Sequence, residues 1–372
     1  MKALFVVPSL KRAGAESQVV SLVNALDAEN FDPHVFIFDR QLDLKQSLDH
    51  SKVRLHQARK KSKIDLTLVR TLADLIEREK IDVVYAVMQY SYLYAWLAVH
   101  RVRRKPGLVA ALHTTLNLGR KEELQDRLLY RFVLQGADKL IFVCNSQKNH
   151  WLRRYPKLEP LAVTVYNGID STYFDPDLYS NPSGIRHEYG LADDDFIFCC
   201  IAGFRPEKGH KILLHAFSIL GGRTKLILVG DGALRTEIAD EIERLGLSRR
   251  IRCTGVLQDV RPILAISHAS VLASTAVETF SMAMLESMSM GVPVIATNIG
   301  GLKEAIIPGE NGMLVPPGDP VALCRAMQEA AENRERFAAY GIRARQLVIA
   351  NFSVNAMARA TETILHEVAS SR

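Results

Sequence analysis

Two glutamates, Glu278 and Glu286, lie eight residues apart in the stretch VETFSMAMLESMSMGVPVIAT. On one continuous helix their positions would be separated by about 12 Å. Carboxylates that attack one glycosidic bond in a retaining hydrolase lie about 5 Å apart, so this chemistry is excluded. No third acid or histidine lies at a spacing typical of metal ligands. The spacing favours an elongated ligand bound at two places, and the alternative is a helix with two solvated acids.

The start of this helix predicts what the middle of the ligand carries. Thr279 is a good N-cap residue, so we expect the helix to begin within 279–281. The free backbone N–H groups of Phe280, Ser281 and Met282 would then attract phosphate. A ligand with a central diphosphate and a hydroxyl-rich sugar at each end is a nucleotide sugar.

A second stretch, GFRPEKG, supplies cations for such a ligand. It begins at Gly203, directly after a predicted strand, and places Arg205 three residues before Lys208. Arginine and lysine at the end of a strand can hold a diphosphate together with the following helix. Taken alone, the stretch also fits a structural turn.

Three further features follow predicted strands. Gly14, in AGAES, permits a tight turn before a helix. His113 ends the run GLVAALH, where a hydrogen-bonded structural histidine is the alternative to a cleft residue. The stretch GDGALR has arginine where a dinucleotide fingerprint requires its third glycine, which disfavours a nicotinamide oxidoreductase.

Short apolar runs alternate with amphipathic segments along the whole chain, a pattern typical of parallel sheets covered by helices on both faces. It predicts an α/β protein with two doubly wound domains, residues 1–175 and 186–350, joined by a linker within 171–195. Residues 351–372 form a C-terminal helix expected to pack back on the first domain. Helices are also expected at 64–80, 121–136 and 319–345. Strands are expected in KALFVV, HVFIF, DVVYAV, GLVAALH, KLIFVC, LAVTVYN, FIFCCIAG, TKLILVG, IRCTG, ASVLAS, PVIAT and GMLVP.

Composition excludes several classes of protein. No apolar run reaches the length of a membrane span, and five cysteines without metal spacing indicate reduced core thiols of a cytoplasmic protein. Residues 1–170 hold 27 basic and 18 acidic residues, with clusters at 60–63, 101–105 and 153–154. This excess predicts a solvated basic face or an anionic membrane surface. Nucleic acid is disfavoured because no recognition motif accompanies the charges.

Taken together, the motifs resemble the retaining glycosyltransferases of family 4, which have the GT-B fold of two facing Rossmann-like domains. The resemblance spans nearly the whole chain. It rests on AGAES, GFRPEKGH, LVGDGALR, the two spaced glutamates, MGVPVIATNIGGLKEAI and GENGMLVPPGD, in the family's order.

The resemblance implies a role for each residue already singled out. Glu278 matches the glutamate that contacts the transferred hexose, and Glu286 the one that binds the ribose. Arg205 and Lys208 match the pair that neutralises the diphosphate. The other residues match positions that contact the donor or line the cleft in the family. They are His113, Gly14, Gly203, Phe280, Ser281 and Met282, together with Val256, which the resemblance places near the base.

The implied activity is retaining transfer of a hexose or N-acetylhexosamine from a nucleoside diphosphate sugar, with UDP favoured. No metal or other cofactor is expected. The acceptor is expected to be a lipid-linked sugar at the inner face of a membrane, in surface polysaccharide or glycolipid assembly. A soluble small acceptor, or a non-catalytic nucleotide-sugar-binding protein, is the alternative.

Two departures from the family pattern bear on the fit around the donor. Ala13 replaces the first glycine of the N-terminal loop, and Thr279-Phe280-Ser281 replaces Gly-Phe-Gly after the first glutamate. Backbone contacts survive both changes, whereas the flexibility of the loop and the shape of the sugar pocket are affected.

Overall fold

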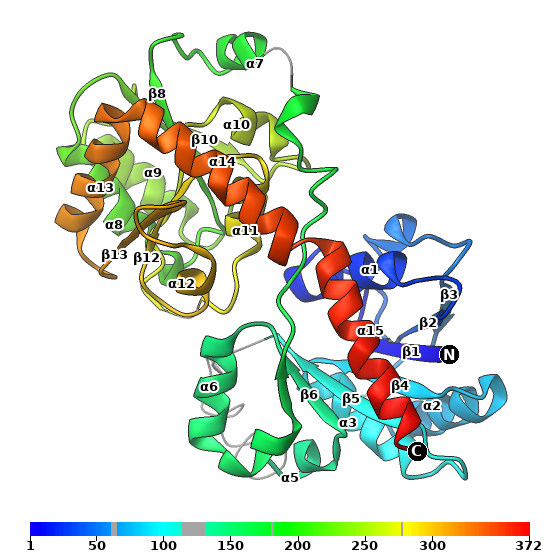
Figure 1. Ribbon diagram of the computed structural model, residues 1–372. Helices are drawn as coiled ribbons and strands as arrows, with labels where there is room; N and C mark the ends of the chain where they lie inside the picture. The colour runs from blue at the N-terminus through cyan, green and yellow to red at the C-terminus, as the bar shows by residue number, and fades with distance from the viewer. Residues whose placement is uncertain (61–64, 114–130, 180–181, 277) are drawn as a thin grey trace. The chain divides into compact units, whose positions relative to one another are not determined.

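The computed structural model describes residues 1–60, 65–113, 131–179, 182–276 and 278–372. It divides into two compact units (Figure 1). Met1–Gly168 and Val354–Arg372 form the first unit, and Ile169–Ser353 form the second. The second unit therefore begins before residue 175, where the sequence analysis ended the first domain. Within the described ranges, no helix combines the length and apolar character that a membrane span requires.

The first unit is built on a seven-stranded parallel sheet in the order β3-β2-β1-β4-β5-β6-β7. Its strands are β1 (Lys2–Val7), β2 (Asp32–Ile37), β3 (Arg54–Gln57), β4 (Val83–Val87), β5 (Gly107–Leu112), β6 (Lys139–Phe142) and β7 (Ala162–Thr164). Its main helices are α1 (Gly14–Ala25), α2 (Leu66–Glu79), α3 (Met88–Val99), α6 (Asn145–Arg154) and α15 (Val354–Ser370), with a short α5 (Arg131–Val133). The predicted helix 121–136 lies mostly outside the described residues.

Alternate side chains of the central strands point to opposite faces of this sheet. They pack into two hydrophobic cores, one on each face. Leu4 and Val6 of β1 pack with α2 and α3, whereas Phe5 and Val7 pack with α1 and α15. Because both faces are covered, these strands are continuously apolar and could be recognised in the sequence. The C-terminal helix α15 lies against α1 and β5 (Figure 1), so it is part of the first unit's core.

The second unit has a six-stranded parallel sheet in the order β10-β9-β8-β11-β12-β13. Its strands are β8 (Phe196–Ile201), β9 (Thr224–Val229), β10 (Ile251–Gly255), β11 (Ala269–Leu272), β12 (Val294–Thr297) and β13 (Gly312–Val315). The covering helices are α7 (Pro182–Glu188), α8 (His210–Ile219), α9 (Arg235–Arg244), α10 (Arg261–Ile266), α11 (Met282–Ser289), α12 (Leu302–Ala305), α13 (Pro320–Glu332) and α14 (Arg334–Asn351).

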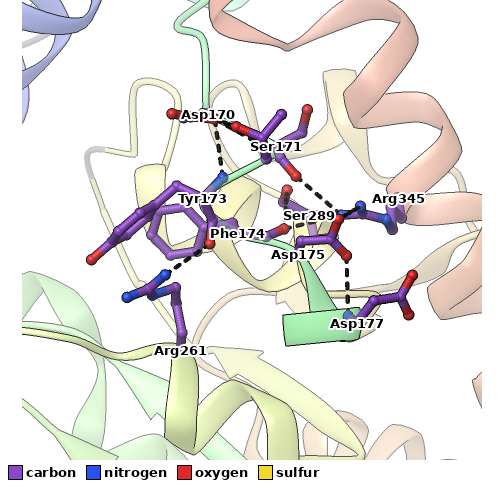
Figure 2. A network of polar contacts seen from close by, with 10 residues as sticks. Asp170, Ser171, Tyr173, Phe174, Asp175, Asp177, Arg261, Ser289 and Arg345 are labelled. Carbon is purple, nitrogen blue, oxygen red and sulfur yellow. Dashed lines mark hydrogen bonds and ion pairs between the residues drawn. The ribbon is translucent and has the colours of Figure 1, made fainter. Parts of the chain in front are cut away.

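The structure corrects two predicted segments. The single helix expected at 319–345 is two helices, because Asn333 leaves helical geometry (φ −121°, ψ 55°) between α13 and α14. The expected linker 171–195 is largely ordered structure of the second unit. It contains α7, and its first part is held by Arg261 and Arg345, as Figure 2 shows.

In both sheets the chain reverses its direction of winding at the centre, between β1 and β4 and between β8 and β11. Ligands of open parallel sheets bind at the carboxyl ends of the strands beside such a switch point. The loops that follow β1, β4, β8 and β11 are therefore the places to look for a site.

Candidate active site

The loop after β8 presents the two predicted cations of the second unit. Arg205 precedes a 3-10 turn, Pro206–Lys208, and Gly209, with a positive φ of 67°, is the N-cap of α8. A Cβ on Gly209 would lie 2.0 Å from the carbonyl oxygen of Ala273. This close approach presses the loop against the segment that follows β11, so the two loops form one site.

Lys208 and Glu278 form a buried ion pair at the contact of these loops. Lys208 Nζ lies 2.8 Å from Glu278 Oε2, and Ser274 Oγ donates a hydrogen bond of 2.8 Å to the same oxygen. The Glu278 side chain is 8% exposed and that of Lys208 is 16% exposed. Since a buried charge is costly unless it is paired, each residue fixes the position of the other.

Arg205 is held more loosely than Lys208. Its Nε lies 3.1 Å from Glu207 Oε1, while the Arg205 side chain remains 58% exposed. An exposed pair of this kind contributes little stability, so the guanidinium can exchange Glu207 for a stronger anion. The loop therefore combines one fixed cation and one adjustable cation.

Helix α11 begins at Met282, and its N-cap is Ser281 instead of the expected Thr279. Ser281 Oγ accepts a hydrogen bond from Met284 N–H at 3.4 Å. The first-turn amides without an intrahelical acceptor are thus shifted toward Met282 and Ala283. Phe280 precedes the helix, and its ring packs against Phe352 at 5.3 Å between centroids.

The two glutamates do not lie on one helix, so the separation calculated for a continuous helix does not apply. Glu278 is in the loop before α11, and Glu286 is in the second turn of that helix. Glu286 is partly buried, and desolvation raises its pKa to about 7. The two carboxyl groups therefore differ in environment: Glu278 is paired with a cation, and Glu286 lacks a neighbouring charge strong enough to offset its desolvation.

The loop after β12 fixes the backbone of Glu278. Gly300 has a φ of 53°, and a Cβ there would lie 1.6 Å from the carbonyl oxygen of Glu278. Gly301 N–H donates to the carbonyl oxygens of Glu278 (3.2 Å) and Thr279 (2.9 Å). Only glycine at position 300 allows this approach, so the NIGG stretch is a support for the site.

Two other predicted donor contacts also follow strands of this sheet. Gly203 lies after β8, and Val256 follows β10 with 74% of its side chain exposed. An apolar side chain exposed to this extent is free to contact a ligand, so the predicted role of Val256 stays a prediction. The predicted residues of the second unit are thus gathered along the carboxyl edge of its sheet.

The first unit holds the remaining predicted residues. Gly14 begins α1, and nothing lies within 4 Å of the position its Cβ would occupy. His113 follows β5, where burial lowers its pKa to about 4. The imidazole is therefore neutral at pH 7 and lines a cavity of about 20 Å³ with Gln18 and Asn167.

Several residues at the site were not singled out from the sequence. Ser274 and Glu207 are ordinary residue types in ordinary loops, so only their positions reveal their contacts with Glu278 and Arg205. The glycine pair at 300–301 is the signal that could have been found, because paired glycines after a strand often mark close backbone approach. Among the described residues, no group of three or more His, Cys, Asp or Glu could hold a metal ion.

Two family models match this chain. The model described as "Glycosyl transferases group 1" matches residues 183–347, and "Glycosyltransferase Family 4" matches residues 12–173. The first lies within the second unit, and the second covers most of the first unit. Between them the models cover every strand of the two sheets except β1.

Curated relatives and solved structures agree with these models. The chain is 29% identical over 310 residues to N-acetyl-alpha-D-glucosaminyl L-malate synthase of Bacillus anthracis, covering 82% of this chain and 79% of the relative. It is 26% identical to D-inositol 3-phosphate glycosyltransferase 2 of Catenulispora acidiphila, covering 76% and 70%. The crystal structure of Anabaena Alr3699/HepE in complex with UDP-glucose superposes over 100% of both chains, with a TM-score of 0.82 and 25% identity.

Proposed function

Because the chain belongs to glycosyltransferase family 4 and has the GT-B fold, we propose that it is a retaining, metal-independent enzyme that takes its sugar from a nucleoside diphosphate sugar. The transferred group is a hexose or N-acetylhexosamine. The observation that carries this proposal is the buried Lys208–Glu278 pair beside the N-terminus of α11.

The chemistry rests on stabilisation of the leaving group. As the glycosidic bond breaks, the departing diphosphate gains negative charge. Lys208 and the first-turn amides of α11 are fixed in advance against that charge, and Arg205 can turn from Glu207 toward it, which lowers the barrier without a metal ion. Glu278 holds Lys208 in place and offers its remaining hydrogen-bonding capacity to hydroxyls of the transferred sugar.

Glu286 binds the ribose in this proposal. Its second-turn position places it farther along α11 than the amides that receive the diphosphate. A carboxyl group accepts hydrogen bonds from vicinal hydroxyls, which is the interaction that a ribose requires. UDP is the favoured nucleotide, and the named UDP-glucose complex of a similar structure supports this choice.

For the acceptor, we propose the hydroxyl of a sugar, with a lipid-linked sugar as the first candidate and a soluble small molecule as the second. The relative named as an N-acetyl-alpha-D-glucosaminyl L-malate synthase favours the second candidate. The basic cluster 101–105 precedes β5, whereas His113 follows it. The cluster therefore belongs to the amino edge of the first sheet, and a membrane contact there would not itself bind the reacting hydroxyl.

The direct test is a donor screen with purified protein. Thermal shift and calorimetry against UDP-, GDP- and ADP-sugars should show binding of one nucleotide class, with UDP-sugars raising the midpoint most. Slow release of free sugar from the same donor, in the presence of chelator, should accompany binding. Failure of every nucleotide sugar to bind would contradict the proposal.

A further inference from the structure

A basic pocket lies at the amino edge of the first sheet. It is a cavity of about 580 Å³, and its lining includes the cations Arg103, Arg104, Lys105 and Arg372 and the carboxylate Asp82. The first three cations stand just before β5, and Asp82 stands just before β4. The residues of this unit that were assigned to the candidate site follow their strands instead, so they lie at the opposite, carboxyl edge. The basic pocket is therefore separate from that site.

The backbone on both sides of the basic pocket is held in place by neighbouring elements. Arg103 N–H donates to Glu77 Oε1 at 3.0 Å, and Gly107 N–H donates to the Asp82 carbonyl oxygen at 2.9 Å. On the other side, a Cβ on Gly107 would lie 2.3 Å from Cγ1 of Val368 in the last turns of α15. The start of β5 and the end of α15 thus pack directly together, and the cations extend from a fixed rim.

Two of the four cations are paired with carboxylates. Arg104 Nη2 lies 2.9 Å from Asp82 Oδ1, and Arg372 Nη2 lies 2.5 Å from Asp138 Oδ1. The other oxygen of Asp82 accepts a hydrogen bond from Lys2 N–H at 2.9 Å. Both oxygens of the single acidic side chain in the lining are therefore occupied, and the charge of Asp82 is offset by its own partner.

The other two cations give the basic pocket its excess of positive charge. The side chains of Arg103 and Lys105 are exposed, and neither forms an ion pair with any residue that the structure describes. The carbonyl end of α15 contributes partial negative charge, but four cationic side chains outweigh it. A guanidinium beside an ammonium group suits the oxygens of a phosphate, which the arginine can bind in a bidentate manner.

The remainder of the lining shows which part of a ligand would be bound. None of the large, exposed apolar side chains of the described residues lines the basic pocket. An acyl chain or a flat ring would thus find no apolar surface there, whereas a charged group finds several donors. The contact would be electrostatic and would weaken as salt is added.

We propose that the basic pocket binds a phosphate group, carried by a small soluble ester or by the headgroup of an anionic phospholipid. The proposal does not depend on the transferase function, because no lining residue belongs to the second unit. An occupied basic pocket would leave the carboxyl edge of the first sheet open. Binding there should accordingly leave the affinity for UDP unchanged.

The test compares two double variants that remove the same charge from the first unit. Arg103→Gln with Lys105→Gln removes the unpaired cations of the basic pocket. Arg101→Gln with Arg153→Gln is the matched control, because both residues are exposed and neither lines the cavity. Calorimetry at low ionic strength measures binding of inorganic phosphate. Flotation measures binding to phosphatidylcholine vesicles with and without phosphatidylglycerol, and melting temperature and UDP affinity are recorded for each protein.

The pocket variant should bind phosphate about ten-fold more weakly than the wild type, because charge-assisted hydrogen bonds are lost. The control should match the wild type, and all three proteins should melt alike. If a lipid supplies the phosphate, vesicles containing phosphatidylglycerol should float the wild type and the control but not the pocket variant. If a soluble ester supplies it, no vesicle should float any of them.

Equal losses in the pocket variant and its control would show a solvated basic face and would overturn the inference. Failure of the wild type to bind both phosphate and phosphatidylglycerol vesicles would also overturn it. Failure to bind UDP alone would instead count against the transferase proposal.

Discussion

At the scale of single residues, the two cations of the loop after β8 differ in how strongly the protein holds them. Lys208 is buried against Glu278, whereas Arg205 is exposed and shares only Glu207. Both are proposed to face the departing diphosphate. Substitutions should therefore have the same effect on turnover and different effects on stability.

Arg205→Ala should lower kcat by about 10²–10³ with an unchanged melting temperature, because its charge acts mainly as the bond breaks. Lys208→Ala should lower both kcat and stability, by about 3–5 kcal/mol, since Glu278 is left buried without its partner. Lys211→Ala, which removes an exposed pair with Glu237, is the control. Steady-state kinetics and calorimetric melting decide the matter, and normal turnover in the Arg205 variant would contradict its role.

The raised pKa of Glu286 predicts that the stability of the folded protein depends on pH. The folded protein retains this proton up to about pH 7, whereas the unfolded chain releases it near 4.5. Because the folded pKa is raised, the ionised carboxylate destabilises the fold above pH 7, and this penalty is relieved as the pH falls toward 4.5. Without donor, Glu286→Gln should therefore melt roughly 2–4 °C above the wild type at pH 8. The difference should vanish near pH 4.5.

Glu335→Gln, at an exposed position of α14, controls for the general effect of removing a negative charge. A melting difference that stays constant with pH would show that Glu286 is not desolvated. The donor-bound state provides a second check, since we expect Glu286→Ala to raise the dissociation constant for UDP more than it lowers kcat.

At the scale of elements, the loops of the second unit are locked together by glycines that a side chain could not replace. Gly300 meets the carbonyl oxygen of Glu278, and its φ is positive. Gly309 has a similar positive φ (81°), but nothing lies within 4 Å of its Cβ position. Comparing alanine substitutions at the two positions therefore separates two free-energy costs. Both variants bear the cost of a positive φ, and only the variant at Gly300 also bears the cost of the clash with Glu278.

Gly309→Ala should cost about 1 kcal/mol of stability and leave kcat unchanged. Gly300→Ala should cost more and should lower kcat at least ten-fold, because the added methyl group displaces the Glu278 backbone. Chemical denaturation and transfer kinetics on both variants make the comparison. Equal behaviour of the two variants would show that Gly300 does not position Glu278.

Elements buried on both faces were the part of the fold that the sequence predicted well. All twelve expected strands are present. Most are apolar runs of the kind that a covered parallel sheet requires, whereas β7 and β10, at the sheet edges, are only partly buried. The edge strand β3, with the sequence RLHQ, was not predicted, since its residues are mostly polar and partly exposed. The break at Asn333 was also missed, because the apolar periodicity of α13 continues into α14 and neither proline nor glycine stands at the break.

The sequence was sufficient to predict which residues belong to the candidate site, but not which of them contact one another. Arg205, Lys208 and Glu278 carry recognisable spacing, whereas the Lys208–Glu278 pair joins residues from two different loops. The choice of Ser281 over Thr279 as N-cap depends on where the backbone turns, which both residue types permit.

At the scale of the whole molecule, the segment after Gly168 belongs to the second unit and is tied to it by arginines (Figure 2). Arg345 Nη2 lies 3.0 Å from Asp175, and Arg345 Nη1 donates to the Phe174 carbonyl oxygen at 3.0 Å. Arg261 Nη1 donates to the Tyr173 carbonyl oxygen at 3.0 Å. Any motion between the units is therefore expected where the chain crosses, at 168–169 and 353–354.

Arg345→Ala should release this segment without unfolding the second sheet. Hydrogen exchange of the amides in 170–178 should become about ten-fold faster, since several backbone acceptors lose their donor, while exchange in β8 and β11 stays slow. Arg343→Ala, two residues away and therefore on a different side of α14, should leave 170–178 protected. Unchanged exchange in the Arg345 variant would show that other contacts hold the segment.

The most direct test of the account is a crystal structure of the protein with UDP and its donor sugar. We predict diphosphate oxygens at the amino end of α11, within hydrogen-bond distance of the Met282 or Ala283 amide and of Arg205 and Lys208. The ribose should contact Glu286. Ordered nucleotide bound elsewhere, with this position unoccupied, would contradict the account.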